Sequence, residues 1–402
     1  MIPKKNLTEY QNLAKDLSQQ KREEVASEQL IDVILRNNLE IIKSILDAMQ
    51  QSVVIIDFIS DNEISALLDK CFHYVGINFY THQHSAELWI PFQLRNNRFS
   101  SSLVRTDNVS NATDLYYYFA LYPHMHAICH NGTEGLERFD FAQNHLTSHI
   151  SKFVESEMWK QQNALNIFIP ATHPLVPLTS ITSPFLSQLS HPTFFSTDYD
   201  GGASYPKDII VPYRSDVRTY PQVSKRTLLL AFCSEPVQKV RTDILKKYAN
   251  LGDDIVVRDG HVSSGYYSKL LASSLFCFMI RGDTFSSARL FSLIESGCIP
   301  VIVSNWIYLP FQRLIDYSKF CLFVSEGEAM TKPLELIRRL RLIRTEEILL
   351  FQKYLFQARF LLLYDSNFFL NPTNLMFIEA HILRRCASFS VRNENFCKPF
   401  RT

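Results

Sequence analysis

The segment 268–326 constrains the fold most, because it alternates short apolar runs with a helix-like stretch. The runs Leu275–Ile280 and Ile299–Val303 are apolar on both faces, which is typical of parallel strands covered by helices on either side. Arg289–Ser296 lies between them and is long and mixed enough to form the connecting helix. The segment therefore predicts a strand–helix–strand unit of a parallel sheet.

The turn between the first strand and the helix is a candidate site for an anion. Gly282 permits a positive φ and close approach of a ligand, and Ser286 or Ser287 can cap the helix. Free N–H groups and the helix dipole favour negative charge there, and Arg289 could bind a diphosphate with two hydrogen bonds. On this pattern alone, a capped connection without a ligand remains an alternative. The candidate residues are Arg281, Gly282, Asp283, Thr284, Ser286, Ser287 and Arg289.

The same residues carry a family resemblance. The stretch SLFCFMIRGDTFSSARLFSLIESGCIPVIVSN, followed by LPFQRLIDYSKFCLFVS, resembles the C-terminal half of the exostosin-like glycosyltransferases of family 47. Looser matches lie upstream, at KDIIVPY (207–213), at 225–232 with Arg241, and at Trp159. The resemblance spans roughly residues 84–326 and is dense only in 268–326.

The resemblance implies a hexosyl- or pentosyltransferase with a GT-B fold. Such an enzyme moves a sugar, with inversion, from a nucleotide-sugar such as a UDP-sugar to a glycan acceptor, in the Golgi lumen. Arg289 and the backbone of 282–287 would stabilise the diphosphate leaving group, so neither a metal ion nor a cofactor besides the donor substrate is expected. The general base should come from the first domain or the cleft, and the sequence names no residue for it.

Two departures from the family pattern affect the donor half. Ser292 replaces an acidic residue, and Tyr308 replaces the glutamate before Leu-Pro-Phe. Carboxylates accept hydrogen bonds from ribose or sugar hydroxyls, so both positions are included in the candidate donor site. Their replacement is expected to lower the affinity for a nucleotide-sugar. Glu295 lies about 4.5 Å further along the helix and should not reach the same ligand atom. A catalytically inactive carbohydrate- or partner-binding protein is therefore the alternative function.

The 402 residues suit an α/β protein of two domains with helices at both ends. We expect a helical extension or stem at 1–50, a Rossmann-like acceptor domain at 51–222, and a Rossmann-like nucleotide-sugar domain with terminal helices at 223–402. The two domains would face a cleft, as in GT-B proteins. Ser180–Pro206 is polar and aperiodic and predicts a loop at that cleft, in which Asp198-Tyr199-Asp200 is a turn rather than a manganese site.

The net charge and the cysteine spacing argue against nucleic acid and zinc as binding partners. The formal net charge of +1, with both signs spread along the chain, does not indicate nucleic-acid binding. None of the eight cysteines forms a C-x-x-C pair, so a zinc site is not expected. Cysteines 277, 298 and 321 lie in or beside apolar strands, where cysteine acts as a small hydrophobe, and Cys386 with Cys397 is a candidate disulfide.

The signals for location are mixed. No window has the length and apolar character of a signal peptide or a membrane-spanning helix. N-glycosylation sequons, which fit a lumenal glycoprotein, begin at Asn6, Asn108, Asn111 and Asn131.

Overall fold

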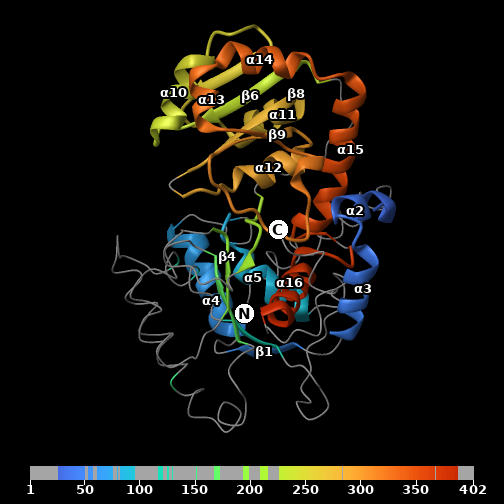
Figure 1. The fold of residues 1–402 in the computed structure, drawn as a ribbon. Coiled ribbons are helices and arrows are strands. Elements are labelled where there is room, and N and C mark those ends of the chain that lie inside the picture. Colours follow the sequence, from blue (N-terminus) through green and yellow to red (C-terminus); the bar gives the residue numbers. More distant parts are fainter. Residues whose placement is uncertain are drawn as a thin grey trace.

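The chain forms two parallel five-stranded sheets, each with associated helices (Figure 1). This confirms the predicted α/β fold with two parallel sheets. The boundary predicted at 222 lies in a segment that the structure does not describe. The computed structural model describes residues 26–49, 53–57, 61–75, 79, 82–95, 116–120, 125, 129, 151, 167–172, 193–198, 209–215, 226–282, 284–366 and 368–387.

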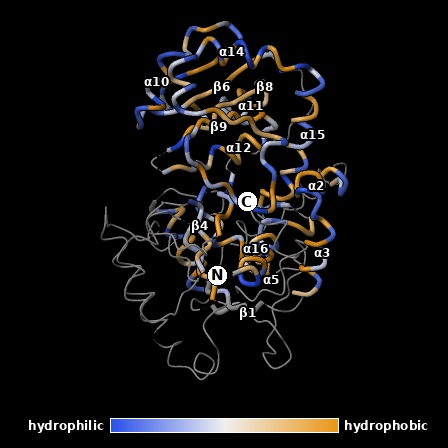
Figure 2. The backbone as a smooth tube through the Cα atoms, in the orientation of Figure 1, coloured by the Kyte–Doolittle hydropathy of each residue, from blue (hydrophilic) through white to orange (hydrophobic). Residues whose placement is uncertain are grey.

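The C-terminal sheet has the order β10-β9-β8-β6-β7. The order reverses between β6 and β8, which is the switch point at which open α/β sheets bind ligands. Strands β8 and β9 are almost wholly buried, as their apolar runs predict, and Figure 2 shows the hydrophobic character of this sheet. The strands are β6 (Leu228–Ser234), β7 (Ile255–Asp259), β8 (Ser274–Ile280), β9 (Ile299–Val303) and β10 (Leu322–Val324).

Helices cover this sheet on both faces (Figure 1). The helix predicted between β8 and β9 is α12 (Arg289–Ser296), and it ends where Gly297 adopts a left-handed φ of 70°. The N–H of Cys298 then bonds the carbonyl of Leu293 at 3.1 Å, which closes the helix end in the manner of a Schellman motif. The other helices are α10 (Lys239–Tyr248), α11 (Ser264–Ser273), α13 (Glu326–Thr331) and α14 (Pro333–Arg341).

The N-terminal sheet has the sequential order β1-β2-β3-β4-β5, so the reversal of strand order is seen only in the C-terminal sheet among the described strands. Strand β4 lies inside the segment Ser180–Pro206, and the prediction of a loop there was wrong for these four buried residues. Their sequence, TFFS, is too short within a polar stretch to show a strand period. The strands are β1 (Val53–Asp57), β2 (Tyr116–Ala120), β3 (Ile167–Ala171), β4 (Thr193–Ser196) and β5 (Ile209–Ile210).

The terminal helices connect the two sheets. Helix α15 (Thr345–Leu362) packs on α12, while α16 (Pro372–Ala387) returns to the N-terminal sheet, where Phe377 contacts Phe168 and Phe195. Near the N-terminus, α2 (Glu28–Ile34) contacts α15 and α3 (Leu39–Ala48) contacts α16. Residues 28–48 are therefore a helical cover. The remaining helices are α4 (Asp61–Lys70), a π-helical turn (Cys71–Val75), α5 (Ala86–Arg95) and a 3-10 turn (Tyr317–Lys319).

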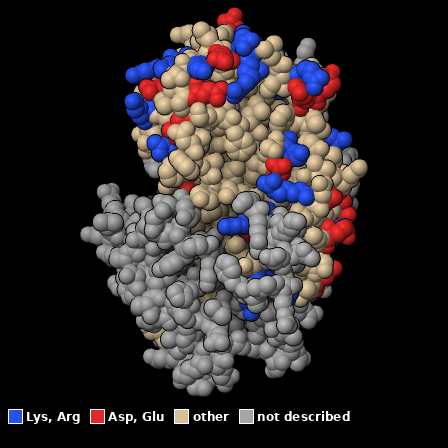
Figure 3. Space-filling view, in the orientation of Figure 1, with Lys and Arg blue, Asp and Glu red and all other residues tan. Residues whose placement is uncertain are grey.

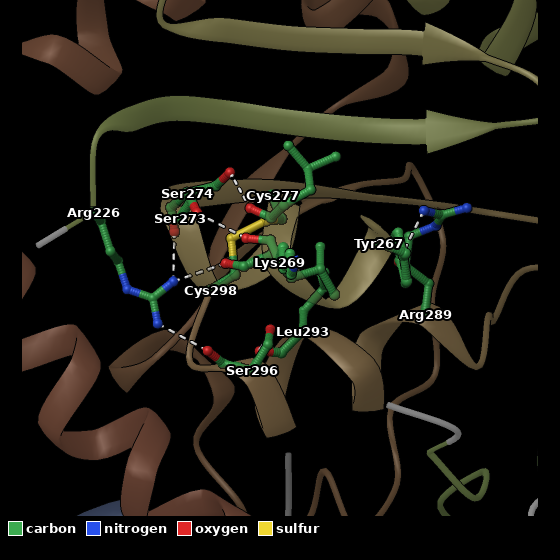
Figure 4. Close-up of a disulfide and its surroundings, with 12 residues drawn as sticks. Arg226, Tyr267, Lys269, Ser273, Ser274, Cys277, Arg289, Leu293, Ser296 and Cys298 are labelled. Carbon is green, nitrogen blue, oxygen red and sulfur yellow. Dashed lines mark hydrogen bonds between the residues drawn. A yellow bond between two sulfur atoms is a disulfide. The ribbon is translucent and has the colours of Figure 1, made fainter. Parts of the chain in front are cut away.

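The disulfide pairing shows that the prediction for two of the cysteines was wrong. Cys277 and Cys298 form a disulfide, with their Cα atoms 5.9 Å apart, rather than serving as separate apolar side chains (Figure 4). Cys321 is free and buried, as predicted. Cys71 pairs with Cys129, and Cys386 is also disulfide-bonded, although its predicted partner Cys397 lies outside the described residues.

Two surface properties bear on the partners of the protein. In the part of the chain that the structure describes, no helix is both long and apolar enough to cross a membrane. Acidic and basic side chains are intermixed on the face shown in Figure 3.

Candidate functional site

The candidate site lies at the carboxyl end of β8, beside the switch point of the C-terminal sheet. The chain leaves β8 at Ile280 and enters α12 at Arg289, so the predicted anion turn is the connection between them. Of the predicted residues, Asp283 lies outside the described part of the chain. Ser286 is buried, whereas half-buried positions are held by Arg281, Gly282, Thr284, Ser287 and Arg289.

Gly282 serves close packing rather than a left-handed backbone. Its φ lies outside the left-handed region that Gly252, Gly260 and Gly297 adopt, so the positive φ that glycine permits is not used here. A Cβ atom at this position would lie 3.3 Å from Nη2 of Arg241. Glycine therefore gives the Arg241 guanidinium room beside the turn, and a Cβ atom would make that side chain shift by a few tenths of an ångström.

Arg241 reaches the turn from α10, and the sequence reasoning did not include it among the site residues. Its Nε donates to the carbonyl oxygen of Arg281 at 2.8 Å, which fixes both the guanidinium and the first residue of the turn. The only sequence signal for Arg241 was its position in the family pattern. A fixed, permanently charged guanidinium at this place adds to the attraction of the turn for an anion.

Two further guanidinium groups flank the turn. Arg281 lies with its Nε 3.4 Å from Glu326 Oε1 and stacks over Phe285. Arg289 donates from Nη1 to the hydroxyl of Tyr267 at 3.1 Å, and its guanidinium lies 4.9 Å from the ring centre of Phe232 (Figure 4). The turn is thus bordered by three arginines, of which Arg289 stands at the first position of the helix.

The two serines of the turn have different roles. Ser287 accepts the N–H of Arg289 on its Oγ at 3.3 Å and so stabilises the first residue of α12, although the N-cap position is Ala288 and Ser287 is not the helix cap. Ser286 instead faces the N-terminal domain. Its Oγ donates to the carbonyl of Thr197 at 3.1 Å and lies 3.0 Å from the hydroxyl of Tyr213, so it does not cap the helix.

A carboxylate from the N-terminal domain completes this contact. Asp198 follows β4, and its Oδ2 accepts the backbone N–H of Ser286 at 3.1 Å. Burial and the charge of Asp198 raise the pKa of Tyr213, while hydrogen bonds from Ser286, Thr197 and Thr284 oppose that rise. The turn therefore does meet an anion, although one that the protein itself supplies.

The two positions at which the resemblance predicts carboxylates, Ser292 and Tyr308, lie in different surroundings. Ser292 is on α12 and is only 3% exposed, and every residue of this helix from Leu290 to Ser296 is buried. Tyr308 is 45% exposed in the segment that follows β9, near the exposed indole of Trp306. A carboxylate at 292 would enter a dry helix surface, whereas the change at 308 leaves an aromatic side chain open to solvent.

Glu295 belongs to a separate cluster of buried charges at the other end of α12. Burial, and next the nearby charge of Asp365, raise the pKa of Glu295 to about 7, against the opposing charges of Arg214 and Arg359. These groups lie beside a small cavity lined by Glu295, Phe356, Arg359, Phe360, Leu363, Asp365 and Ser366. Glu295 is thus placed away from the anion turn.

Replacing Glu295 with glutamine is expected to flatten the pH dependence of stability. Because the carboxyl pKa is raised on folding, the native state holds a proton that the unfolded state releases, and the free energy of unfolding falls as pH rises from about 5 to 7. The slope should reach at most about 1.4 kcal/mol per pH unit. Urea unfolding of both proteins between pH 5 and 8 measures it.

The matched control is Glu347→Gln. Arg344 lowers the pKa of this exposed carboxyl, so the variant should keep the parental slope above pH 5. An unchanged slope in Glu295→Gln would contradict the assignment of the proton to Glu295.

Comparisons with known proteins identify the family. Residues 53–340 match the model of the exostosin GT47 domain. The chain is 30% identical over 304 residues to the "Probable arabinosyltransferase ARAD1" of Arabidopsis thaliana, covering 71% of this chain and 66% of that protein. It is 39% identical over 67 residues to the "Exostosin-1 homolog" of Caenorhabditis elegans, covering 17% of this chain and 18% of that protein.

A solved structure titled "Crystal Structure of TarM" aligns with 69% of this chain and 51% of its own, at 9% identity and a TM-score of 0.30. The chain spans less than two thirds of the length of the curated relatives named above. The family model nevertheless covers most of the chain, on both sheets. The chain therefore belongs to the exostosin family of glycosyltransferases, GT47.

Proposed function

We propose that the protein transfers a sugar from a UDP-sugar donor to a glycan acceptor, with inversion at the anomeric carbon. The observation that carries the proposal is the set of guanidinium groups of Arg241, Arg281 and Arg289 around the N-terminal end of α12. They surround a turn at the switch point of the sheet, where a diphosphate can accept backbone and guanidinium hydrogen bonds together.

In this reaction the arginines stabilise the charge that develops on the leaving diphosphate. A guanidinium stays protonated at physiological pH, so its positive charge is always available to the negative charge of the diphosphate. The donor nucleotide-sugar is then the only small molecule the reaction needs besides the acceptor. The named arabinosyltransferase among the relatives supports a pentose donor, and the exostosins leave a hexose-based donor open.

The alternative is a binding protein that has kept the family fold without transfer. It is favoured by Ser292 and Tyr308, which stand where the family has carboxylates. An active donor site and a binding-only relative differ in their response to nucleotide. At a UDP concentration of 100 times Kd, a donor site should gain about 2.7 kcal/mol of stability, and a protein without such a site gains none.

The test of the function is a transfer assay on the purified protein with UDP-pentoses and UDP-hexoses and an oligosaccharide panel. Formation of a lengthened glycan supports the proposal and names the donor. Absence of transfer from every donor favours the binding protein instead, and a missing response to UDP adds to that result.

We place the protein in the lumen of the Golgi. Its disulfides Cys71–Cys129 and Cys277–Cys298 support an oxidising compartment, and the sequons fit a lumenal glycoprotein. The exostosin family supports the Golgi among such compartments.

Replacing Arg289 with alanine is expected to weaken UDP binding by about 1.5–3 kcal/mol, or roughly 10- to 150-fold, because a charge-assisted hydrogen bond to the diphosphate is lost. Calorimetric titration measures the change. Arg258→Ala is the matched control, since Arg258 is an exposed arginine of the same sheet that stacks over Tyr266. Equal UDP affinity in Arg289→Ala and the parent protein would remove Arg289 from the site.

A further inference from the structure

One carboxylate crosses from the N-terminal domain to the turn that would hold the diphosphate. Asp198 is 3% exposed and lies two residues beyond the end of β4, at the carboxyl edge of the N-terminal sheet. Its Oδ2 accepts the N–H of Ser286 at 3.1 Å. The carboxyl edges of the two sheets therefore meet here. The N-terminal side contributes the carboxylate of Asp198, and the C-terminal side contributes the N–H of Ser286, which precedes α12.

The surroundings hold Asp198 in place. Ser196 Oγ donates to the carbonyl oxygen of Asp198 at 2.9 Å. Thr197 donates to the carbonyl of Thr172 on the N-terminal side and accepts Ser286 Oγ on the C-terminal side. The bonds from Ser196 and to Thr172 lie within the N-terminal domain, so they can hold the backbone beside the carboxylate when a donor separates Asp198 from Ser286.

We infer that Asp198 is the general base of the transfer, an assignment that rests on the proposed function. A donor whose diphosphate occupies the turn takes the N–H of Ser286 in place of Asp198, so the two domains must separate here by the width of a sugar ring. With the sugar in that gap, the diphosphate would lie on one side of the anomeric carbon and the released carboxylate on the other. That is the arrangement an inverting displacement requires, with base and leaving group on opposite faces.

The step balances as follows. Asp198 takes the proton of the acceptor hydroxyl, and the acceptor oxygen forms a bond to the anomeric carbon. The bond between that carbon and the diphosphate oxygen breaks, and its electron pair leaves with the diphosphate. Arg241 and Arg289 border the turn that receives this charge.

A purely structural role for Asp198 makes a different prediction, and Asp198→Asn separates the two. The amide oxygen of asparagine still accepts the N–H of Ser286, so the contact between the domains is kept, but an amide does not act as a base. We expect kcat to fall by about 10²- to 10⁴-fold, the usual contribution of a general base. We expect the melting temperature and the Kd for UDP to stay near those of the parent or to improve, because a competing negative charge has been removed from the turn.

Asp198→Glu supplies the conservative variant, since it keeps a carboxylate on a longer arm, and it should recover part of the lost kcat. An Asp198→Asn protein whose kcat stays within about tenfold of an active parent overturns the assignment. A parent that binds UDP but transfers no sugar overturns the proposed function, which is a separate result.

Discussion

Replacing Arg226 with methionine is expected to lower the free energy of unfolding by about 3–5 kcal/mol, because a half-buried charged donor is removed from several carbonyls at once. Nη1 of Arg226 donates to the carbonyls of Leu271 and Ser274 at 2.8 and 2.7 Å, and Nη2 donates to that of Ser296 at 2.8 Å (Figure 4). These carbonyls end α11 and α12, and Ser274 and Ser296 are fully buried. Methionine keeps an unbranched apolar stem and removes all three hydrogen bonds.

Urea unfolding at neutral pH measures the loss. Arg226→Lys should lie between methionine and the parent, because one ammonium group does not reproduce the fork of a guanidinium. Arg258→Met controls for the loss of a surface arginine, and we expect a change within about 0.5 kcal/mol. A methionine variant as stable as that control would show that the three carbonyls find other partners.

Removing the disulfide by Cys277→Ala with Cys298→Ala is expected to lower the free energy of unfolding by about 3 kcal/mol. The bond closes a loop with a sequence separation of 21, and constraint of the unfolded chain by a loop of that size is worth about this much. The closed loop contains the whole anion turn and α12, so UDP affinity should fall as well.

Cys321→Ala is the matched control, because Cys321 is buried and free and its removal reports the local cost of losing a buried sulfur. The stability of the double variant is compared with the parent after that cost is subtracted. If the parent with its disulfide reduced unfolds at the same urea concentration as the oxidised parent, the bond does not stabilise this domain.

The elements of the C-terminal sheet could be predicted because their signals are local. Strand β9 and helix α12 have the bounds that the apolar runs and Gly297 indicate, and β8 begins one residue earlier. The same pattern located the anion turn. Its two serines could not be told apart, because only the position of the other domain decides that Ser286 faces Thr197 while Ser287 stabilises the helix.

The signals that failed depend on residues far apart in the sequence. Cys277 pairs in register with Pro300, which brings Cys298 alongside, and the spacing of the two cysteines does not reveal this. Asp198 looked like part of a polar turn because β4 has only four residues. Arg241 could be placed at Gly282 only when α10 was packed beside the turn.

The return of α16 to the N-terminal sheet means that the chain passes between the sheets twice, and the two passages touch. Tyr364 on the second passage donates to the carbonyl of Pro212 on the first at 3.1 Å, and Arg214 lies 3.9 Å from Asp365. The two connecting segments between the domains are therefore joined side by side and form one seam. These contacts restrict how the domains can move: separation at Ser286 by rotation about this seam keeps both contacts, whereas sliding one domain past the other would break them.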